Sequence, residues 1–178
     1  GRHIVNMEII SPNPVITITA SDENKYLLLD DAAYFKVKIK YPGSTAFVAL
    51  DVYSDTFSFV PSKGPNDKSK LIYSPQHLKD GIYELAVSVI DASGNLASVE
   101  DYTIAFKVIT KSTITNVYPY PNPFTTKTRF VFTLTGEKVP DFLRISILNV
   151  SGTIVKEINL DEIGPLSIGN NITSYEWN

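Results

Sequence analysis

The chain has 178 residues, of which 43% are hydrophobic and 20% charged, so it can bury a core and is not a disordered polymer. Its net charge of −3 argues against a nucleic-acid-binding domain. The absence of cysteine excludes disulfides, thiolate metal sites and cysteine nucleophiles. No apolar run approaches the roughly 18 residues of a membrane-spanning helix, and no basic start precedes an apolar run, so neither a span nor a signal peptide is predicted.

Apolar and polar residues alternate along nearly every segment, which is typical of half-buried antiparallel strands. In chain order, strands are predicted at 4–10, 15–19, 34–40, 46–53, 57–60, 70–73, 82–90 and 102–109, and then at 128–135, 142–149, 153–160 and 172–177. A single helical turn is predicted at 74–79. We therefore expect an all-β fold of the antiparallel sandwich type.

Residues 110–124 are predicted to be an extended linker or an edge, because Pro119, Pro121 and Pro123 lack the N–H that a central strand donates. This boundary divides the chain into residues 1–111 and residues 112–178. We expect two tandem immunoglobulin-like antiparallel β-sandwich modules. The second has only four predicted strands, too few for a closed sandwich.

The segment D-G-I-Y-E-L at 80–85 is typical of the tyrosine corner of immunoglobulin-like sandwiches. There, a tyrosine at the start of a late strand hydrogen-bonds back to the preceding corner. Asp80 and Gly81 supply the turn and Tyr83 the hydroxyl, so we assign these residues a structural role.

Oxygen-bearing side chains alternate at Asp91, Ser93 and Asn95, as they do in calcium loops. The competing interpretation is a hairpin turn in which Asp and Asn cap their own backbone. The acidic residues at 22–24 and 30–31 are interpreted as solvated loops. Calcium is the one candidate cofactor, and we expect none to be required.

The sequence shows no complete catalytic constellation. The two histidines, His3 and His77, lie near the terminus and in a polar loop, and no G-x-S-x-G, H-E-x-x-H or P-loop motif occurs. We therefore assign no catalytic residue and expect this chain not to be an enzyme by itself.

The most specific signal lies after residue 117. It reads Y-P-Y-P-N-P-F at 118–124, and this motif leads into an alternating apolar segment at 128–132. Three more segments follow: I-S-I at 145–147, V-S-G-T-I-V at 150–155 and Y-E-W-N at 175–178. Together they resemble the immunoglobulin-like domain of flagellar hook-assembly proteins and of the C-terminal sorting domains of the Bacteroidetes type IX secretion system.

Further segments are similar to one subset, the gingipain-like cysteine peptidases of the type IX secretion sortase family. These segments are 130–136 and 164–172 in the tail, and 22–24, 28–31, 78–83 and 91–95 in the preceding immunoglobulin-like domain. In the family pattern a turn and a last strand follow the segment matched here by 175–178. The resemblance therefore implies that the second module lacks its last strand and that the catalytic domain lies outside this chain.

The resemblance implies a non-catalytic accessory role at the C-terminal end of a secreted or cell-surface protein. The first module would be a spacer, and the second would be part of a tail recognised by export or attachment machinery. Expected partners are proteins of that machinery or neighbouring domains, with no nucleic acid and no membrane span. Within the motif Pro121, Asn122, Pro123 and Phe124, we expect Phe124 to plug the core of the second module.

The alternative hypothesis is a carbohydrate- or surface-adhesion module of an exported protein. Sandwiches of this kind bind sugars through aromatic side chains on one face, and Tyr118 and Tyr120 form a candidate cluster. A separate expectation concerns self-association. Without a last strand, the segment carrying Phe130, Phe132 and Leu134 would lie at an open edge. We expect residues 125–178 to be completed by another chain or by residues 4–10, or else to be the less stable of the two modules.

Overall fold

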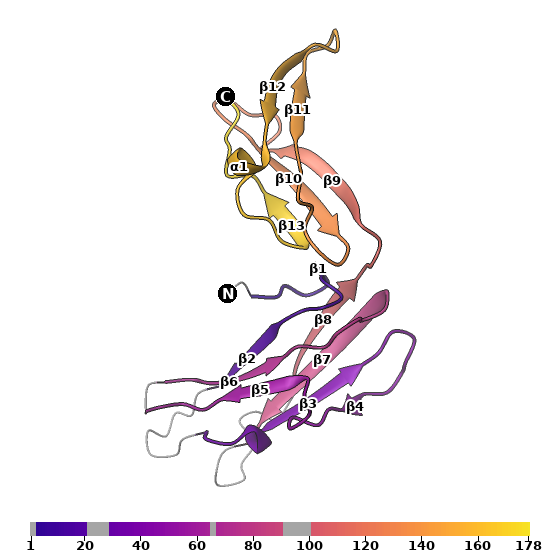
Figure 1. Cartoon of the computed structure of the whole chain (residues 1–178), viewed down its shortest axis with the longest axis vertical. Helices are drawn as coiled ribbons and strands as arrows, with labels where there is room; N and C mark the ends of the chain where they lie inside the picture. The colour runs from indigo at the N-terminus through magenta and orange to yellow at the C-terminus, as the bar shows by residue number, and fades with distance from the viewer. Residues whose placement is uncertain (1–2, 21–28, 65–66, 91–100) are drawn as a thin grey trace. The chain divides into compact units, whose positions relative to one another are not determined.

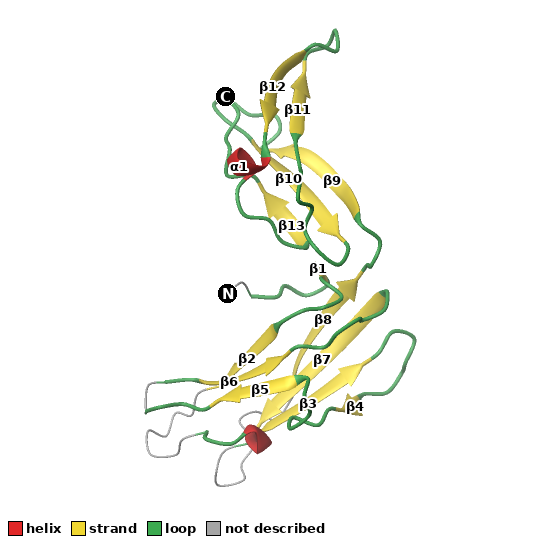
Figure 2. Ribbon diagram, in the orientation of Figure 1, coloured by secondary structure: helices red, strands yellow, loops and turns green. Residues whose placement is uncertain are grey.

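The computed structural model describes residues 3–20, 29–64, 67–90 and 101–178. Strands make up 46% and helices 4% of this part of the chain, which confirms the predicted all-β fold class (Figure 2). Among the described residues, no helix is long and apolar enough to cross a membrane.

Contacts divide the chain into two compact units. The first runs to Val108, the second runs from Ile109 to Asn178, and the short segment Ile9–Ser11 is grouped with the second. Each unit is described by itself below.

The first unit contains a five-stranded sheet with the order β1-β8-β7-β3-β4, antiparallel from β8 to β4, and a three-stranded antiparallel sheet with the order β2-β6-β5 (Figure 1). The strands are β1 (Glu8–Ile10), β2 (Ile16–Ala20), β3 (Phe35–Lys40), β4 (Val48–Ala49), β5 (Phe57–Val60), β6 (Ser69–Tyr73), β7 (Gly81–Val89) and β8 (Tyr102–Val108).

Alternation explains how the two sheets form a sandwich. In β3, Phe35, Val37 and Ile39 are buried, while the lysines between them face outward. Phe35 meets Phe59 of β5 edge-on, with ring centroids 6.0 Å apart, so these aromatic side chains join the five-stranded sheet to the three-stranded one.

Three predictions for the first unit are wrong in detail. The strand predicted at 46–53 is reduced to β4, because Asp51 accepts a hydrogen bond from the Tyr53 N–H and turns the chain. The strand predicted at 4–10 is only β1. No helix forms at 74–79. A 3-10 helix lies instead at Ala32–Tyr34, where the Asp31 side chain accepts from the Ala33 N–H.

The second unit contains a three-stranded sheet with the order β13-β10-β9 and a two-stranded hairpin, β11-β12. Its elements are β9 (Thr113–Tyr120), β10 (Arg129–Thr135), β11 (Ile145–Leu148), β12 (Ile154–Ile158), the single-turn helix α1 (Leu160–Ile163) and β13 (Gly169–Ile172). The core consists of Phe132, Leu134, Leu143, Ile158 and Ile163.

The expectation of an open edge at Phe130, Phe132 and Leu134 is wrong. These residues belong to β10, which is the central strand of its sheet, paired with β9 on one side and β13 on the other. The segment interpreted as linker or edge supplies β9, and Pro119 is tolerated because β9 lies at the edge of the sheet. Residues 4–10 do not complete this sheet, since β1 pairs with β8.

The end of the second unit also differs from the prediction. The strand expected at 172–177 lies earlier in the chain, as β13, and ends at Ile172. The residues after it leave the sheet, and the chain pairs again only at Trp177, opposite Thr128. Trp177 and Thr128 exchange two backbone hydrogen bonds of 2.8 Å. The predicted strand at 153–160 ends at Ile158, and α1 follows because Glu162 accepts from the Asn159 N–H.

Candidate functional site

The segment 118–124, which carries the most specific sequence signal, lies on the surface of the second unit. Tyr118 and Tyr120 are 47% and 64% exposed, and Phe124 is 38% exposed. The prediction that Phe124 plugs the core is therefore wrong. The core is filled by β10 and by residues that follow it, which leaves Phe124 outside.

Hydrogen bonds from Thr128 hold this exposed segment in place. The buried Thr128 hydroxyl donates to the Pro121 carbonyl oxygen over 2.8 Å, and the Thr128 backbone is paired with Trp177. The peptide bonds preceding Pro121 and Pro123 are both cis, and Asn122 between them is exposed. The motif Pro121, Asn122, Pro123 and Phe124 is a surface turn, held at Pro121 by the Thr128 hydroxyl.

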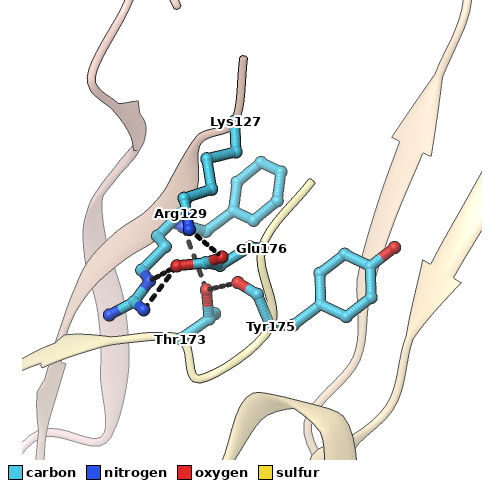
Figure 3. A network of polar contacts seen from close by, with 6 residues as sticks. Lys127, Arg129, Thr173, Tyr175 and Glu176 are labelled. Atoms are coloured by element: carbon cyan, nitrogen blue, oxygen red, sulfur yellow. Dashed lines mark hydrogen bonds and ion pairs between the residues drawn. The ribbon is translucent and has the colours of Figure 1, made fainter. Parts of the chain in front are cut away.

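A polar network next to Thr128 ties down residues 173–176 (Figure 3). The Glu176 carboxylate accepts from Lys127 Nζ at 2.6 Å and from Arg129 Nε at 3.0 Å. The hydrogen bond from Lys127 has the largest effect on the pKa of Glu176, and together with the one from Arg129 it holds that pKa below its ordinary value. The Thr173 hydroxyl accepts from the Phe130 N–H at 3.1 Å and donates to the Tyr175 carbonyl oxygen at 2.8 Å.

The two exposed tyrosines share one face of the three-stranded sheet. Tyr118 lies opposite Val131, which lies opposite Ile172, so these three form one cross-strand row. Tyr120 lies opposite Arg129, whose charge is paired with Glu176. The face therefore combines aromatic and aliphatic side chains with Arg129, which shares the Glu176 carboxylate with Lys127.

Sequence analysis identified Tyr118 and Tyr120 but missed the rest of this face. Ile172 comes from a segment more than fifty residues away, and Glu176 is 47 residues from Arg129. No local pattern links these residues; only the pairing of β13 with β10 brings them to the same sheet.

The first unit has a shallow cleft of about 550 Å³ over the outer face of β3. Its acidic side chains are engaged by neighbours: Asp101 accepts from Lys38 Nζ at 2.9 Å, and Asp51 accepts from the Tyr53 N–H. The hydrogen bond from Lys38 lowers the pKa of Asp101. Both carboxylates act as hydrogen-bond acceptors at the edge of this cleft.

Close to this cleft, Asp31 accepts from the Ala33 N–H and from the Tyr53 hydroxyl. The hydrogen bond from Ala33, and after it the one from Tyr53, lowers the pKa of Asp31. The hydrogen bond between Tyr53 and Asp31 also raises the pKa of Tyr53. Asp31 therefore caps the 3-10 helix and anchors Tyr53.

The residues assigned to a tyrosine corner have that geometry. Tyr83 is buried, and its hydroxyl donates to the Lys79 carbonyl oxygen at 3.0 Å. Burial raises the pKa of Tyr83. Gly81 has φ of 144°, and a Cβ built there would lie 2.5 Å from Pro42, so the turn after Asp80 requires glycine.

The calcium candidates Asp91, Ser93 and Asn95 lie outside the described residues, as do residues 22–24. Among the residues that the structure does describe, no three His, Cys, Asp or Glu side chains gather where they could hold a metal ion.

Comparison with family models and with curated proteins finds no match to this chain.

Proposed function

We propose that the chain is a non-catalytic pair of immunoglobulin-like modules from an exported, surface-associated Bacteroidetes protein. Under this proposal, the second unit is recognised by protein partners of a type IX export or attachment machinery. The observation that supports this best is the display of segment 118–124, in which Tyr118, Tyr120 and Phe124 are exposed on a turn held by Thr128. Fixed, exposed aromatic side chains provide contact area at a low cost in conformational entropy.

The proposal gives the first unit a spacing role and leaves any peptidase chemistry to other parts of the parent protein. Its two-sheet core and buried tyrosine corner suit a rigid spacer. The location proposed for the protein is the cell surface, the outer membrane or the extracellular space, where it would meet proteins of the export or attachment machinery.

Substitution of the three aromatic side chains tests this function. In a Bacteroidetes strain with a type IX system, the parent protein carrying Tyr118→Ala, Tyr120→Ala and Phe124→Ala should fail to reach the surface, as measured by protease accessibility on intact cells. The purified variant should keep the far-ultraviolet circular dichroism spectrum of the wild type, since these side chains lie outside the core.

The matched control replaces two aromatic side chains that are exposed elsewhere, Tyr102 at 67% and Phe142 at 74%. Tyr102→Ala with Phe142→Ala should leave surface delivery unchanged. Normal delivery of the first variant, or equal loss with the control, would contradict the proposal.

A second candidate function, binding of a neutral glycan, is favoured by one observation. Tyr118 and Tyr120 lie two residues apart on the same face of the sheet, beside Val131 and Ile172. Arg129, the charged residue opposite Tyr120, is paired with Glu176. Sugar rings stack on such aromatic faces. Glycan-array binding that disappears with Tyr118→Ala and Tyr120→Ala, while surface delivery persists, would favour this candidate over the first.

A further inference from the structure

The cleft over the outer face of β3 forms where the chain turns away after β4. The Leu50 N–H still donates to the Val37 carbonyl oxygen at 2.9 Å, one residue past β4. The chain then turns, because the Asp51 carbonyl oxygen accepts from the Ser54 N–H at 3.1 Å and the Asp51 side chain accepts from the Tyr53 N–H at 3.0 Å. Residues 51–53 therefore leave the sheet, and a cleft of about 550 Å³ remains beside the first residues of β3.

Tyr53 lines this cleft as an exposed aromatic side chain that is held in place. Its hydroxyl donates to Asp31 and its backbone N–H donates to Asp51, so the residue is tethered at both ends. Even so, 66% of Tyr53 is exposed. An aromatic ring that is already held loses little conformational entropy when a ligand packs on it. Tyr53 is therefore suited to stack against the apolar face of a ligand ring.

Polar groups of both signs lie in the same cleft. Lys36 and Lys38 stand on the outer face of β3, and Lys38 Nζ donates to Asp101 at 2.9 Å. Asp101 also accepts from the Ser88 side chain, yet Lys38 and Asp101 remain 44% and 33% exposed. An ammonium group has three N–H donors and a carboxylate about four acceptor sites, so these bonds leave both groups with capacity for a ligand.

The lining favours a neutral ligand that is rich in hydroxyl groups. Lys36 and Lys38 balance Asp51 and Asp101, so the side chains that line the cleft carry no net formal charge. An anion would meet the two carboxylates, and a cation would meet the two ammonium groups. An alkyl ligand would desolvate all four charges without giving them hydrogen bonds. A sugar hydroxyl both donates and accepts, and a sugar ring has an apolar C–H face for the tyrosine.

We propose that this cleft binds a neutral oligosaccharide. Tyr53 stacks on one sugar ring, while Lys38 and Asp101 hydrogen-bond to its hydroxyl groups. The volume of the cleft lies within the range of about 300–1,000 Å³ that is typical of small-molecule sites. The site belongs to the first unit, whereas Tyr118 and Tyr120 belong to the second, and the inference does not depend on the proposed function.

NMR titration of the full chain with three neutral oligosaccharides tests the proposal. The probes are cellohexaose, maltohexaose and mannohexaose, which differ in linkage and in hydroxyl orientation. At least one of them should shift the amide signals of residues 36–38, 51–53 and 88 in a saturable way. Tyr53→Ala should weaken this binding by about tenfold or more, because it removes the aromatic contact. Tyr53→Phe keeps the ring but loses the hydrogen bond to Asp31, and should weaken binding by only about two- to threefold.

The matched control is Tyr118→Ala with Tyr120→Ala, which removes two exposed tyrosines from the other unit. It should leave the affinity for the same oligosaccharide unchanged. Hexagalacturonic acid, an acidic oligosaccharide with the same number of rings, should bind more weakly than the neutral probe. Thermal melts of each variant check the fold, which Tyr53→Ala should keep because this side chain is exposed.

Three results would overturn the proposal. If none of the neutral probes shifted the cleft amides, the cleft would not be a saccharide site. Unchanged affinity in folded Tyr53→Ala, or an equal loss in the Tyr118 and Tyr120 control, would place the binding elsewhere. Tighter binding of hexagalacturonic acid would contradict the neutral class of ligand.

Discussion

The two units close their interiors by different means. The first packs aromatic and aliphatic side chains against one another: Tyr83 stacks on Phe106 with centroids 5.4 Å apart, and Phe35 meets Phe59. The second has a core of five apolar residues and also buries the polar side chains of Thr128, Thr133, Thr135, Asn171 and Thr173.

Each buried polar side chain of the second unit has hydrogen-bond partners. Thr133 donates to Asn170 Oδ1, Thr135 donates to the Lys111 carbonyl oxygen, and Asn171 bonds the backbone of Ser167 in both directions. A satisfied hydrogen bond contributes about 1 kcal/mol net, but loss of one partner costs about 1–3 kcal/mol. The first unit also buries polar side chains, Glu8 and the hydrogen-bonded Ser69, but the second buries five of them around a smaller apolar core, so its stability depends more on polar satisfaction.

The largest effect is expected from emptying each core in turn. Phe106→Ala in the first unit and Phe132→Ala in the second each remove a buried ring and should cost about 3–5 kcal/mol of unfolding free energy. Because the second core has only five members, Phe132→Ala should leave that unit unfolded at room temperature. Two-dimensional NMR resolves the two units. If Phe132→Ala unfolded both, the units would not be independent in stability.

The next largest effect tests polar satisfaction in the second unit. Thr173→Val preserves shape but removes the acceptor of the Phe130 N–H and the donor to Tyr175, and should cost about 1–3 kcal/mol. Thr173→Ser keeps the hydroxyl and is the control, with a smaller loss. Urea unfolding of both variants measures the difference. Equal stability of the wild type and Thr173→Val would remove the distinction drawn between the two units.

A smaller effect is expected at the tyrosine corner of the first unit. Tyr83→Phe keeps the ring stacked on Phe106 but loses the hydrogen bond to the Lys79 carbonyl oxygen, and should cost about 1 kcal/mol. The second unit should be unaffected. Tyr41→Phe serves as the control, because Tyr41 contacts the Tyr83 ring but is itself 42% exposed. A cost confined to Tyr41→Phe would contradict the role given to the Tyr83 hydroxyl.

The smallest effect concerns pH. The pKa of Glu176 is lowered from its ordinary value of 4.5, so its carboxylate stabilises the second unit above that pH. This contribution is lost as the pH falls through the lowered pKa. Glu176→Gln should therefore lower the melting temperature of the second unit at pH 7, and the difference from wild type should shrink in acid. Glu137→Gln, an exposed substitution in the same unit, should show no such trend.

Local patterns in the sequence predicted most strands and the fold class. Alternation at 34–40, 82–90 and 102–109 located β3, β7 and β8 within a residue or so, because a half-buried strand must place apolar side chains at every second position. The tyrosine corner at Asp80, Gly81 and Tyr83 could also be predicted from the sequence, because the hydrogen bond from the Tyr83 hydroxyl to the Lys79 carbonyl oxygen spans only four residues. The wrong elements were those decided by turns, as at 46–53, where Asp51 bends the chain.

The sequence by itself determined the period of the strands, the glycine turn at Asp80 and Gly81, and the absence of cysteine chemistry. Only the tertiary structure decided that β10 is central, that Phe124 lies outside the core, and that Glu176 meets Lys127 and Arg129. Strand order depends on which segments pair over long separations, and a two-residue period is the same for a central strand and for an edge.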